Sequence, residues 1–315
     1  MPLSTLSTIA SVTQENSQYF MDTFAAGDAR TGWRQVVVEL PSGNKSGSRS
    51  TWYGSPPKMR DVTDGPLNVE DAYLNTYSFD FKTFKAALRM KRTWIEDDDL
   101  GLIPPLVAGL AQEAARFPGE HALEALSVNP LAFDGTALIA DSRSIGKSGT
   151  IDNNIGASAS DVADPTVAEV RTALKDVRAA MTSFKDDQGR VMGLAPNMHI
   201  IPQTYSDAFF AALSGNQTSG IGDQVLPQSD NNLYTVNGHT FFVNHLTTDT
   251  DAFYSLRIDG TQGPLGWSTR VPASLEEIGD SSDSYVIDDE IVQAVRMRGE
   301  RAVGDPRRII KTTFT

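Results

Sequence analysis

The chain has 315 residues, of which 40% are hydrophobic, so it is long enough for one large domain or two smaller ones with a real core. Its formal net charge of -13 argues against a surface that binds nucleic acid or anionic membrane over its whole extent, because a polyanion would be repelled on average. It contains no cysteine, which excludes disulfides, thiolate nucleophiles and cysteine-ligated metal centres.

Residues 1–32 are rich in Ser, Thr, Ala and Gly, with scattered apolar positions at Phe20, Met21 and Phe24. This composition predicts an arm with a short helix, ordered partly by contact with something else. The terminus has neither the basic start nor the apolar core of a signal peptide. The most apolar run, residues 101–111, is shorter than the roughly 20 residues that a membrane-spanning helix requires. We therefore expect a soluble protein without a membrane partner.

Residues 33–40 are predicted to form a strand, and residues 41–60 after them reverse the charge of the chain. That segment has no acidic residue, and its basic and aromatic side chains are Lys45, Arg49, Trp52, Tyr53, Lys58 and Arg60. A solvated hairpin tip is one interpretation, since loops lie on surfaces. A loop that reaches onto an acidic neighbouring subunit is a second, and a surface for single-stranded nucleic acid is a third.

A long strand followed by a long helix is predicted next. From Phe84 to Trp94 apolar and basic residues alternate, which is typical of a half-buried strand. The acidic turn at residues 96–99 can cap a following helix, predicted over residues 104–126 with a kink or a restart at Pro118-Gly119.

The second half of the chain mixes helices and strands. A short strand at residues 136–140 and a polar loop at 142–163 precede a helix opened by Asp164-Pro165, whose apolar positions are Val167, Val170, Leu174, Val177, Met181 and Phe184. Further strands are predicted at residues 198–201, 233–236, 240–246, 253–258, 285–303 and 308–314, with a helix through Leu213, a turn at Asn237-Gly238 and a loop at 260–267.

A phosphate-binding loop around Lys147 is the main enzymatic alternative. Gly146-Lys147-Ser148 resembles the end of such a loop, but Asp141 stands where a glycine is needed and Gly149 stands where a helix should begin. A carboxylate at that position would repel the phosphates. A flexible loop is the preferred interpretation.

The spacing of the histidine, aspartate and serine residues is not diagnostic of a metal site or of a catalytic triad. His239 and His245 could be combined with Asp249 and Asp251, but two histidines six residues apart are unspecific, and we interpret them, like His199, as core or surface residues. No glycine-flanked serine elbow is present. We therefore assign no catalytic, cofactor-binding or metal-binding residue and do not expect an enzyme.

Several motifs in a fixed order resemble the major capsid proteins of tailed phages, and among them the Mu-like phage major head subunit family. The motifs are Trp52-Tyr53-Gly54, residues 57–60, residues 92–98, Phe133-Asp134-Gly135, and the closing strands at 299–303 and 309–314. The resemblance covers nearly the whole chain past the first thirty residues. It implies an α+β, Hong Kong ninety-seven-type phage capsid fold.

The resemblance also implies a division of the chain. It comprises an N-terminal arm (1–32), an extension loop with flanking strands (33–94), a peripheral domain with the spine helix (95–149), an axial domain (150–270) and the return strands of the peripheral domain (271–315).

The function implied is a shell protein that assembles into hexamers and pentamers of an icosahedral capsid around phage double-stranded DNA. Its implied partners are other copies of itself, a separate scaffolding protein, a portal protein and DNA bound without sequence specificity. Its place is the virion, after assembly in the host cytoplasm. Some capsids of this fold are crosslinked by a lysine–asparagine bond, but no asparagine follows Asn244, so a noncovalent shell is expected. A nanocompartment shell resembling encapsulins is the alternative within the same fold.

Overall fold

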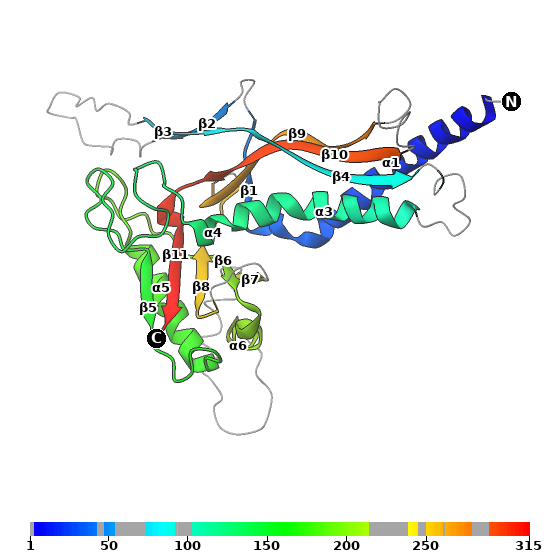
Figure 1. Cartoon of the computed structure of the whole chain (residues 1–315). Coiled ribbons are helices and arrows are strands. Elements are labelled where there is room, and N and C mark those ends of the chain that lie inside the picture. The colour runs from blue at the N-terminus through cyan, green and yellow to red at the C-terminus, as the bar shows by residue number, and fades with distance from the viewer. Residues whose placement is uncertain are drawn as a thin grey trace, which may run out of the picture.

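The computed structural model describes residues 3–42, 47–53, 74–91, 93, 103–213, 239–244, 250–260, 262–278 and 290–315. Two β-sheets set at a steep angle dominate the molecule (Figure 1). A long layer of strands and helices lies across the top, and a second sheet with its own helices hangs below one end. A thin two-stranded hairpin extends from the long layer.

The four-stranded sheet of the long layer has the order β1-β9-β10-β4. Its strands are β1 (Val38–Glu39), β9 (Leu265–Ile278), β10 (Glu290–Val303) and β4 (Lys82–Lys91). The central strand β10 runs antiparallel to both β9 and β4, whereas β1 pairs in parallel with the first residues of β9. Ten residues of β4 pair with β10 in unbroken register.

Two helices cover one face of this sheet, α1 (Leu3–Thr31) and α3 (Ile103–Leu123). Phe84 and Leu88 of β4 pack into the core between sheet and helices and Met90 is fully buried in it, while Lys85 and Arg89 are exposed. The alternation predicted for this strand is therefore confirmed. The burial of apolar side chains against the sheet is the main force that holds both helices in place.

The five-stranded sheet has the order β5-β11-β8-β6-β7. Its strands are β5 (Asn154–Ala157), β11 (Ile309–Phe314), β8 (Ala252–Leu256), β6 (Met198–Ile201) and β7 (Thr240–Val243). Helices α5 (Val167–Ser183) and α6 (Ser206–Leu213) pack on it through a second core. Short 3-10 helices are also present among the described residues, at Trp33–Gln35, Gln203–Tyr205 and Pro306–Arg308.

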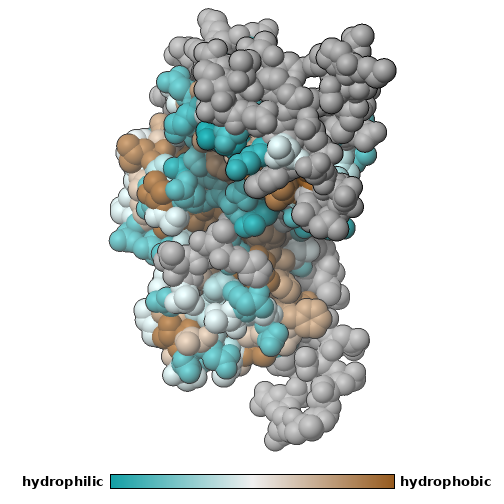
Figure 2. All heavy atoms as spheres, turned by 45° about the vertical axis from the view of Figure 1, so that its right-hand side comes forward, coloured by the Kyte–Doolittle hydropathy of each residue, from teal (hydrophilic) through white to brown (hydrophobic). Residues whose placement is uncertain are grey.

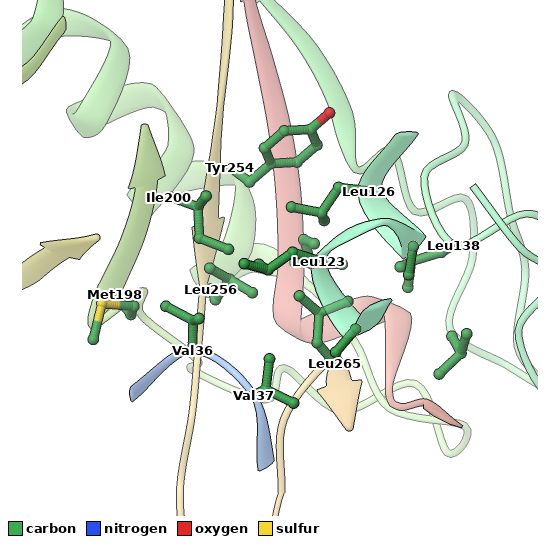
Figure 3. Close-up of a cluster of buried hydrophobic side chains, with 14 of the residues drawn as sticks. Val36, Val37, Leu123, Leu126, Leu138, Met198, Ile200, Tyr254, Leu256 and Leu265 are labelled. Carbon is green, nitrogen blue, oxygen red and sulfur yellow. The ribbon is translucent and has the colours of Figure 1, made fainter. Parts of the chain in front are cut away.

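A third core joins the two sheets at the end of α3. The short helix α4 (Ala125–Val128) follows α3 there. In Figure 3, side chains from α3 and α4 converge with Val36 and Val37, with Met198 and Ile200 of β6, and with Leu256 of β8. Because one core contains residues from both sheets, the angle between the two layers is fixed by packing.

Most strongly periodic segments are confirmed. The helix predicted over residues 104–126 is present as α3 and α4, and α3 passes through Pro118 without a break. The helix opened by Asp164-Pro165 is α5, and it buries five of its apolar positions: Val170, Ala173, Leu174, Val177 and Met181. The strands at 198–201 and 308–314 match β6 and β11 closely.

Other predictions are wrong. The short helix of the arm is a 29-residue helix that lies along α3, because Phe20 is buried against α3 and the sheet and Phe24 packs beside it. Residues 33–40, predicted as a strand, form a 3-10 turn followed by two strand residues. The reason is that Trp33, Val36 and Val37 are all buried in the core that joins the two sheets. The strand at 136–140 is only an isolated bridge between Leu131 and Ala137.

Two loops were also predicted too long. The polar loop at 142–163 contains β5, which pairs with the last strand of the chain, a partner that no local pattern reveals. The loop at 260–267 ends at Leu265, where the unpredicted strand β9 begins. Residues 96–99, 233–236, Asn237-Gly238 and the first five residues of the strand predicted at 285–303 lie outside the described residues.

Candidate assembly surface

The predicted contact residues belong to a hairpin that projects from the body. Strand β2 (Gly47–Tyr53) pairs antiparallel with β3 (Leu74–Asp80), in a register that runs from Gly47 opposite Asp80 to Tyr53 opposite Leu74. Arg49, Trp52 and Tyr53 lie on β2, whereas Lys45, Lys58 and Arg60 lie outside the described residues. Within the described part of the chain, β2 pairs with β3 and with no other strand. The hairpin is thus attached to the body at its base.

A small apolar cluster anchors that base. Phe79 and Phe81 are buried against Ala302 of β10, with Leu40 and Tyr77 packed beside them. The rings of Phe79 and Phe81 meet edge to face, with their centroids 5.7 Å apart. Phe81 is also the residue between β3 and β4, so the chain passes from the hairpin into the large sheet at this cluster.

A chain of charged side chains, here called the ionic joint, lies next to this cluster. Glu300 of β10 pairs through one carboxylate oxygen with Lys82 Nζ at 3.0 Å and through the other with His121 Nε2 at 3.0 Å. His121 Nδ1 lies 3.3 Å from Glu124, which pairs at 2.7 Å with Arg301. These five residues, Lys82, His121, Glu124, Glu300 and Arg301, connect β4, the end of α3 and β10.

Aromatic rings enclose the imidazole of the ionic joint. The ring of Phe117 stacks on His121 at 5.5 Å, and Phe84 and Trp267 approach it edge-on at 5.4 and 6.0 Å. The rings keep water from most of His121, whose side chain is 15% exposed. Its polar contacts are therefore restricted to the two carboxylates, Glu124 and Glu300.

Electrostatic effects at Glu300 reflect this arrangement. Burial alone would raise the pKa of Glu300, but the hydrogen bonds and charges of His121 and Lys82 outweigh it, so the pKa lies below its usual range. Burial, together with the charge of Glu300, raises the pKa of Tyr77 at the hairpin base. Glu300 is thus ionised at neutral pH, and its charge acts on Tyr77 at the base of the hairpin.

The loop at Lys147 does not fit a phosphate site. The Lys147 amide donates to the Asp187 carbonyl oxygen at 2.9 Å, and the backbone of Asp187 crowds Gly146. The next helix along the chain is α5, so Ser148 does not open one. A backbone amide that is already used within the protein cannot bind a phosphate, which agrees with the interpretation as a loop.

His199 and His239 form a pair in which His199 is buried and His239 is partly exposed. His199 Nδ1 lies 2.9 Å from Ser255 Oγ, and its Nε2 lies 3.1 Å from Nδ1 of His239. His199 is fully buried, which confirms its interpretation as a core residue. Among the described residues no group of three or more His, Asp or Glu could hold a metal ion; His245 and Asp249 lie outside them.

Where side-chain exposure is described, the exposed large apolar side chains are dispersed. They are Tyr19 and Met21 on α1, Leu106 on α3, Phe210 on α6, and Val128, Leu131 and Val191 in α4 and the loops. The face in Figure 2 accordingly mixes hydrophobic and hydrophilic residues. No described helix has both the length and the apolar character needed to cross a membrane.

Solved structures with the same fold are shells. The chain matches the procapsid protein of bacteriophage JBD30 with a TM-score of 0.55 and 17% identity, over 99% of this chain and 76% of that one. The virus-like particle of Pyrococcus furiosus matches with a TM-score of 0.57 and 9% identity, over 95% of this chain and 98% of that one. The capsid of Myoviridae phage XM1 matches with a TM-score of 0.54 and 12% identity, over 90% of this chain and 92% of that one. The chain therefore has the Hong Kong ninety-seven-type capsid fold, and the predicted α+β class is confirmed.

The family follows from the sequence match. Residues 9–168, just over half of the chain, match the family model described as Mu-like prophage major head subunit gpT, so the chain belongs to this family. No curated protein matches it. The chain is a major capsid protein of a phage head, and its place is the virion.

The ionic joint was not predicted from the sequence. Lys82, His121 and Glu300 are far apart in the chain, and each looks like an ordinary surface charge in its own segment. The pairing of β4 with β10, which places Lys82 opposite Gly299, and the packing of α3 against β10 bring them together.

Proposed function

We propose that the chain assembles into the hexamers and pentamers of an icosahedral shell around phage double-stranded DNA. The membership of the major head subunit family and the capsid fold support this proposal. The observation that carries it is the hairpin β2–β3, which extends away from the body and is anchored at its base. A long projection of this kind reaches surfaces that a compact body cannot reach.

The hairpin would lie on a neighbouring copy in a head-to-tail contact, which closes into a ring when the rotation between copies allows it. Its basic side chains, Lys45, Arg49, Lys58 and Arg60, suit a neighbour that carries a net charge of -13, and Trp52 and Tyr53 would anchor the contact. Each contact can be weak because many act together around a closed shell.

The domain roles are part of the proposal. Residues 1–32 would form the arm, 33–94 the extension loop and its strands, 95–149 the part with the spine helix α3, 150–270 the axial domain, and 271–315 the return strands. A separate scaffolding protein, a portal protein and DNA bound without sequence specificity would be the partners. The role is structural enclosure, with no cofactor and no turnover.

Shortening the hairpin tests its role. Because Ser50 pairs with Tyr77, residues 51–76 can be replaced by the turn Asn-Gly while the base stays intact. We expect this variant to fold but to form no closed particles, measured by analytical ultracentrifugation and cryo-electron microscopy. Wild-type particles from this variant would contradict the proposal.

Charge reversal tests the basic residues. The triple variant Arg49→Glu, Lys58→Glu and Arg60→Glu should assemble poorly, and assembly of the wild type should weaken as salt screens the contact. The matched control is Lys147→Glu, Lys175→Glu and Lys185→Glu, which changes the net charge equally at exposed sites elsewhere. Equal loss of assembly in both triples would remove the case for a specific role of the hairpin charges.

The fold likeness to the virus-like particle of Pyrococcus furiosus makes a nanocompartment the second candidate. The contents of the particles separate the two. Particles purified from a phage lysate should contain double-stranded DNA that survives nuclease treatment, whereas enclosed protein without DNA would favour the nanocompartment.

A further inference from the structure

The ionic joint is placed where the hairpin leaves the body. Phe81 separates the last residue of β3 from Lys82, the first residue of β4, and Lys82 pairs with Glu300. Immediately before it, Phe79 and Tyr77 pack in the cluster that contains Ala302. Any change in the position of Lys82 relative to β10 therefore changes the direction of the hairpin.

Glu300 is the central residue of the ionic joint. Its side chain is 7% exposed, and its two carboxylate oxygens contact partners from two different elements, Lys82 on β4 and His121 on α3. A buried carboxylate that loses a partner is left with an uncompensated charge, so the arrangement strongly favours one position of β4 relative to α3.

The second half of the joint holds the end of α3 against β10. Arg301 donates to the backbone carbonyl oxygen of His121 at 3.3 Å and pairs with Glu124 at 2.7 Å. The stacking of Phe117 and the edge contacts of Phe84 and Trp267 fix the plane of the His121 ring. His121 is thus rigid enough to define where Glu300, and through it Lys82, must lie.

We propose that Glu300 and His121 are positioning residues that set the angle at which the hairpin β2–β3 projects, and thereby the geometry of the contact between copies. They act through Lys82 and need not touch the neighbouring copy. The effect on the contact between copies rests on the proposed function of the hairpin in assembly, whereas the projection angle is a property of the single chain.

The angle can be measured on the unassembled chain. The chain has no cysteine, so spin labels on Thr51→Cys in the hairpin and Glu113→Cys on the exposed face of α3 report one distance. We expect a narrow distance distribution in this background and a shifted, broader one when Glu300→Gln is added. The control is Glu276→Gln, which removes a half-exposed ion pair with Arg296 in the same sheet and should leave the distribution unchanged.

A second variant covers the case in which Glu300→Gln does not fold. Lys82 is 65% exposed, so Lys82→Met should fold, and it should also broaden the distribution, while Lys82→Arg, which keeps the charge, should restore the narrow one. A merely stabilising role would lower the melting temperature without moving the label distance. Unchanged distances in Lys82→Met, and in Glu300→Gln when that variant folds, would overturn the inference.

Assembly provides the second readout. Glu300→Gln and Lys82→Met should give fewer closed particles, or particles of irregular curvature, in cryo-electron micrographs, and Lys82→Arg should give the wild-type product. Altered distances with normal shells would overturn the link between angle and assembly. Normal shells from the chain that lacks residues 51–76 would instead count against the proposed function of the hairpin and leave the distance result standing.

Discussion

At the scale of single residues, Gly119 shows how closely α3 approaches the chain that follows α1. A Cβ added at Gly119 would lie 2.5 Å from Cβ and 2.6 Å from Cγ of Trp33, which is 2% exposed and cannot move aside. Glycine therefore allows the helix to pass against the indole, although it is a poor helix former.

Gly119→Ala should destabilise the protein by about 1–3 kcal/mol, because overpacking outweighs the gain in helix propensity. Gly109 on the same helix has nothing within 4 Å of its added Cβ and is exposed, so Gly109→Ala should stabilise by up to about 1 kcal/mol. Urea unfolding of the unassembled chain measures both. The same sign for the two variants would show that the close approach to Trp33 is not the cause.

The pair His199 and His239 makes stability depend on pH. Burial, with the charge of His239, lowers the pKa of His199 to about 3, and burial with the charges of Arg178 and Arg257 lowers the pKa of His239 to about 4. In the unfolded chain both pKa values lie near 6.5, so below that pH the unfolded state binds protons that the folded state does not. The resulting stability is present above pH 6.5 and is lost progressively as the pH falls towards about 4 for His239 and about 3 for His199.

Protonation of His199 in the unfolded state should by itself lower the free energy of unfolding by roughly 2 kcal/mol between pH 7 and pH 5. The partner variant His239→Gln removes one titrating group, so its free energy of unfolding should fall less steeply between pH 7 and pH 5. Urea unfolding at a series of pH values measures both slopes, and other groups cancel in the comparison. Parallel curves would mean that the pair does not control the acid response.

At the scale of elements, α5 begins with a capping box. The Thr166 hydroxyl accepts from the Glu169 amide, and the Glu169 carboxylate accepts from the Thr166 amide at 2.8 Å. Hydrogen bonds from the Thr166 backbone and side chain, and from Ser160, lower the pKa of Glu169 to about 2. The box satisfies amides that the first turn leaves without helical partners.

Thr166→Ala should lower the free energy of unfolding by about 1 kcal/mol because the capping bond is lost. Thr172, exposed in the middle of the same helix, is the matched control, and Thr172→Ala should be neutral or slightly stabilising since alanine is the better helix former. Thermal unfolding followed by circular dichroism distinguishes them. Equal loss in both variants would contradict a specific role of the cap.

The elements that could be predicted from sequence bury one regular face. Apolar residues recur every second position in β4 and every third or fourth position in α5, because each element packs one face against one core. The pattern is therefore visible in the local sequence. Strand β9 escaped prediction because it contains Pro272 and because its register against β10 shifts near Arg296 and Arg298, which breaks the alternation. Helix α1 escaped because its Ser- and Thr-rich sequence has weak propensity and its order depends on packing against α3.

At the scale of the whole molecule, the candidate site divides in the same way. The basic hairpin could be predicted because its residues are contiguous and reverse the charge of the chain. The ionic joint could not, because its members come from distant segments: His121 and Glu300 are 179 positions apart, and Lys82 lies still further from Glu300 in the sequence. Contiguous features are visible to sequence reasoning, whereas contacts made by tertiary pairing are not.

We predict that the chain forms a shell whose copies are not covalently linked. Its C-terminal strands contain no asparagine after Asn244, so the lysine–asparagine bond that crosslinks some capsids of this fold has no asparagine there. The copies would then be held by many reversible contacts, each contributing little, whose sum keeps a closed shell intact. Such a shell should dissociate in denaturant, because no covalent bond joins its subunits.

Mature particles heated in detergent should therefore run as one band near the chain's mass of 34.1 kDa. Particles held for days before heating provide the control for slow crosslinking, and they should give the same band. Oligomeric bands that resist heating and reductant would show a covalent link between subunits, and mass spectrometry of those bands would then identify the residues that carry it.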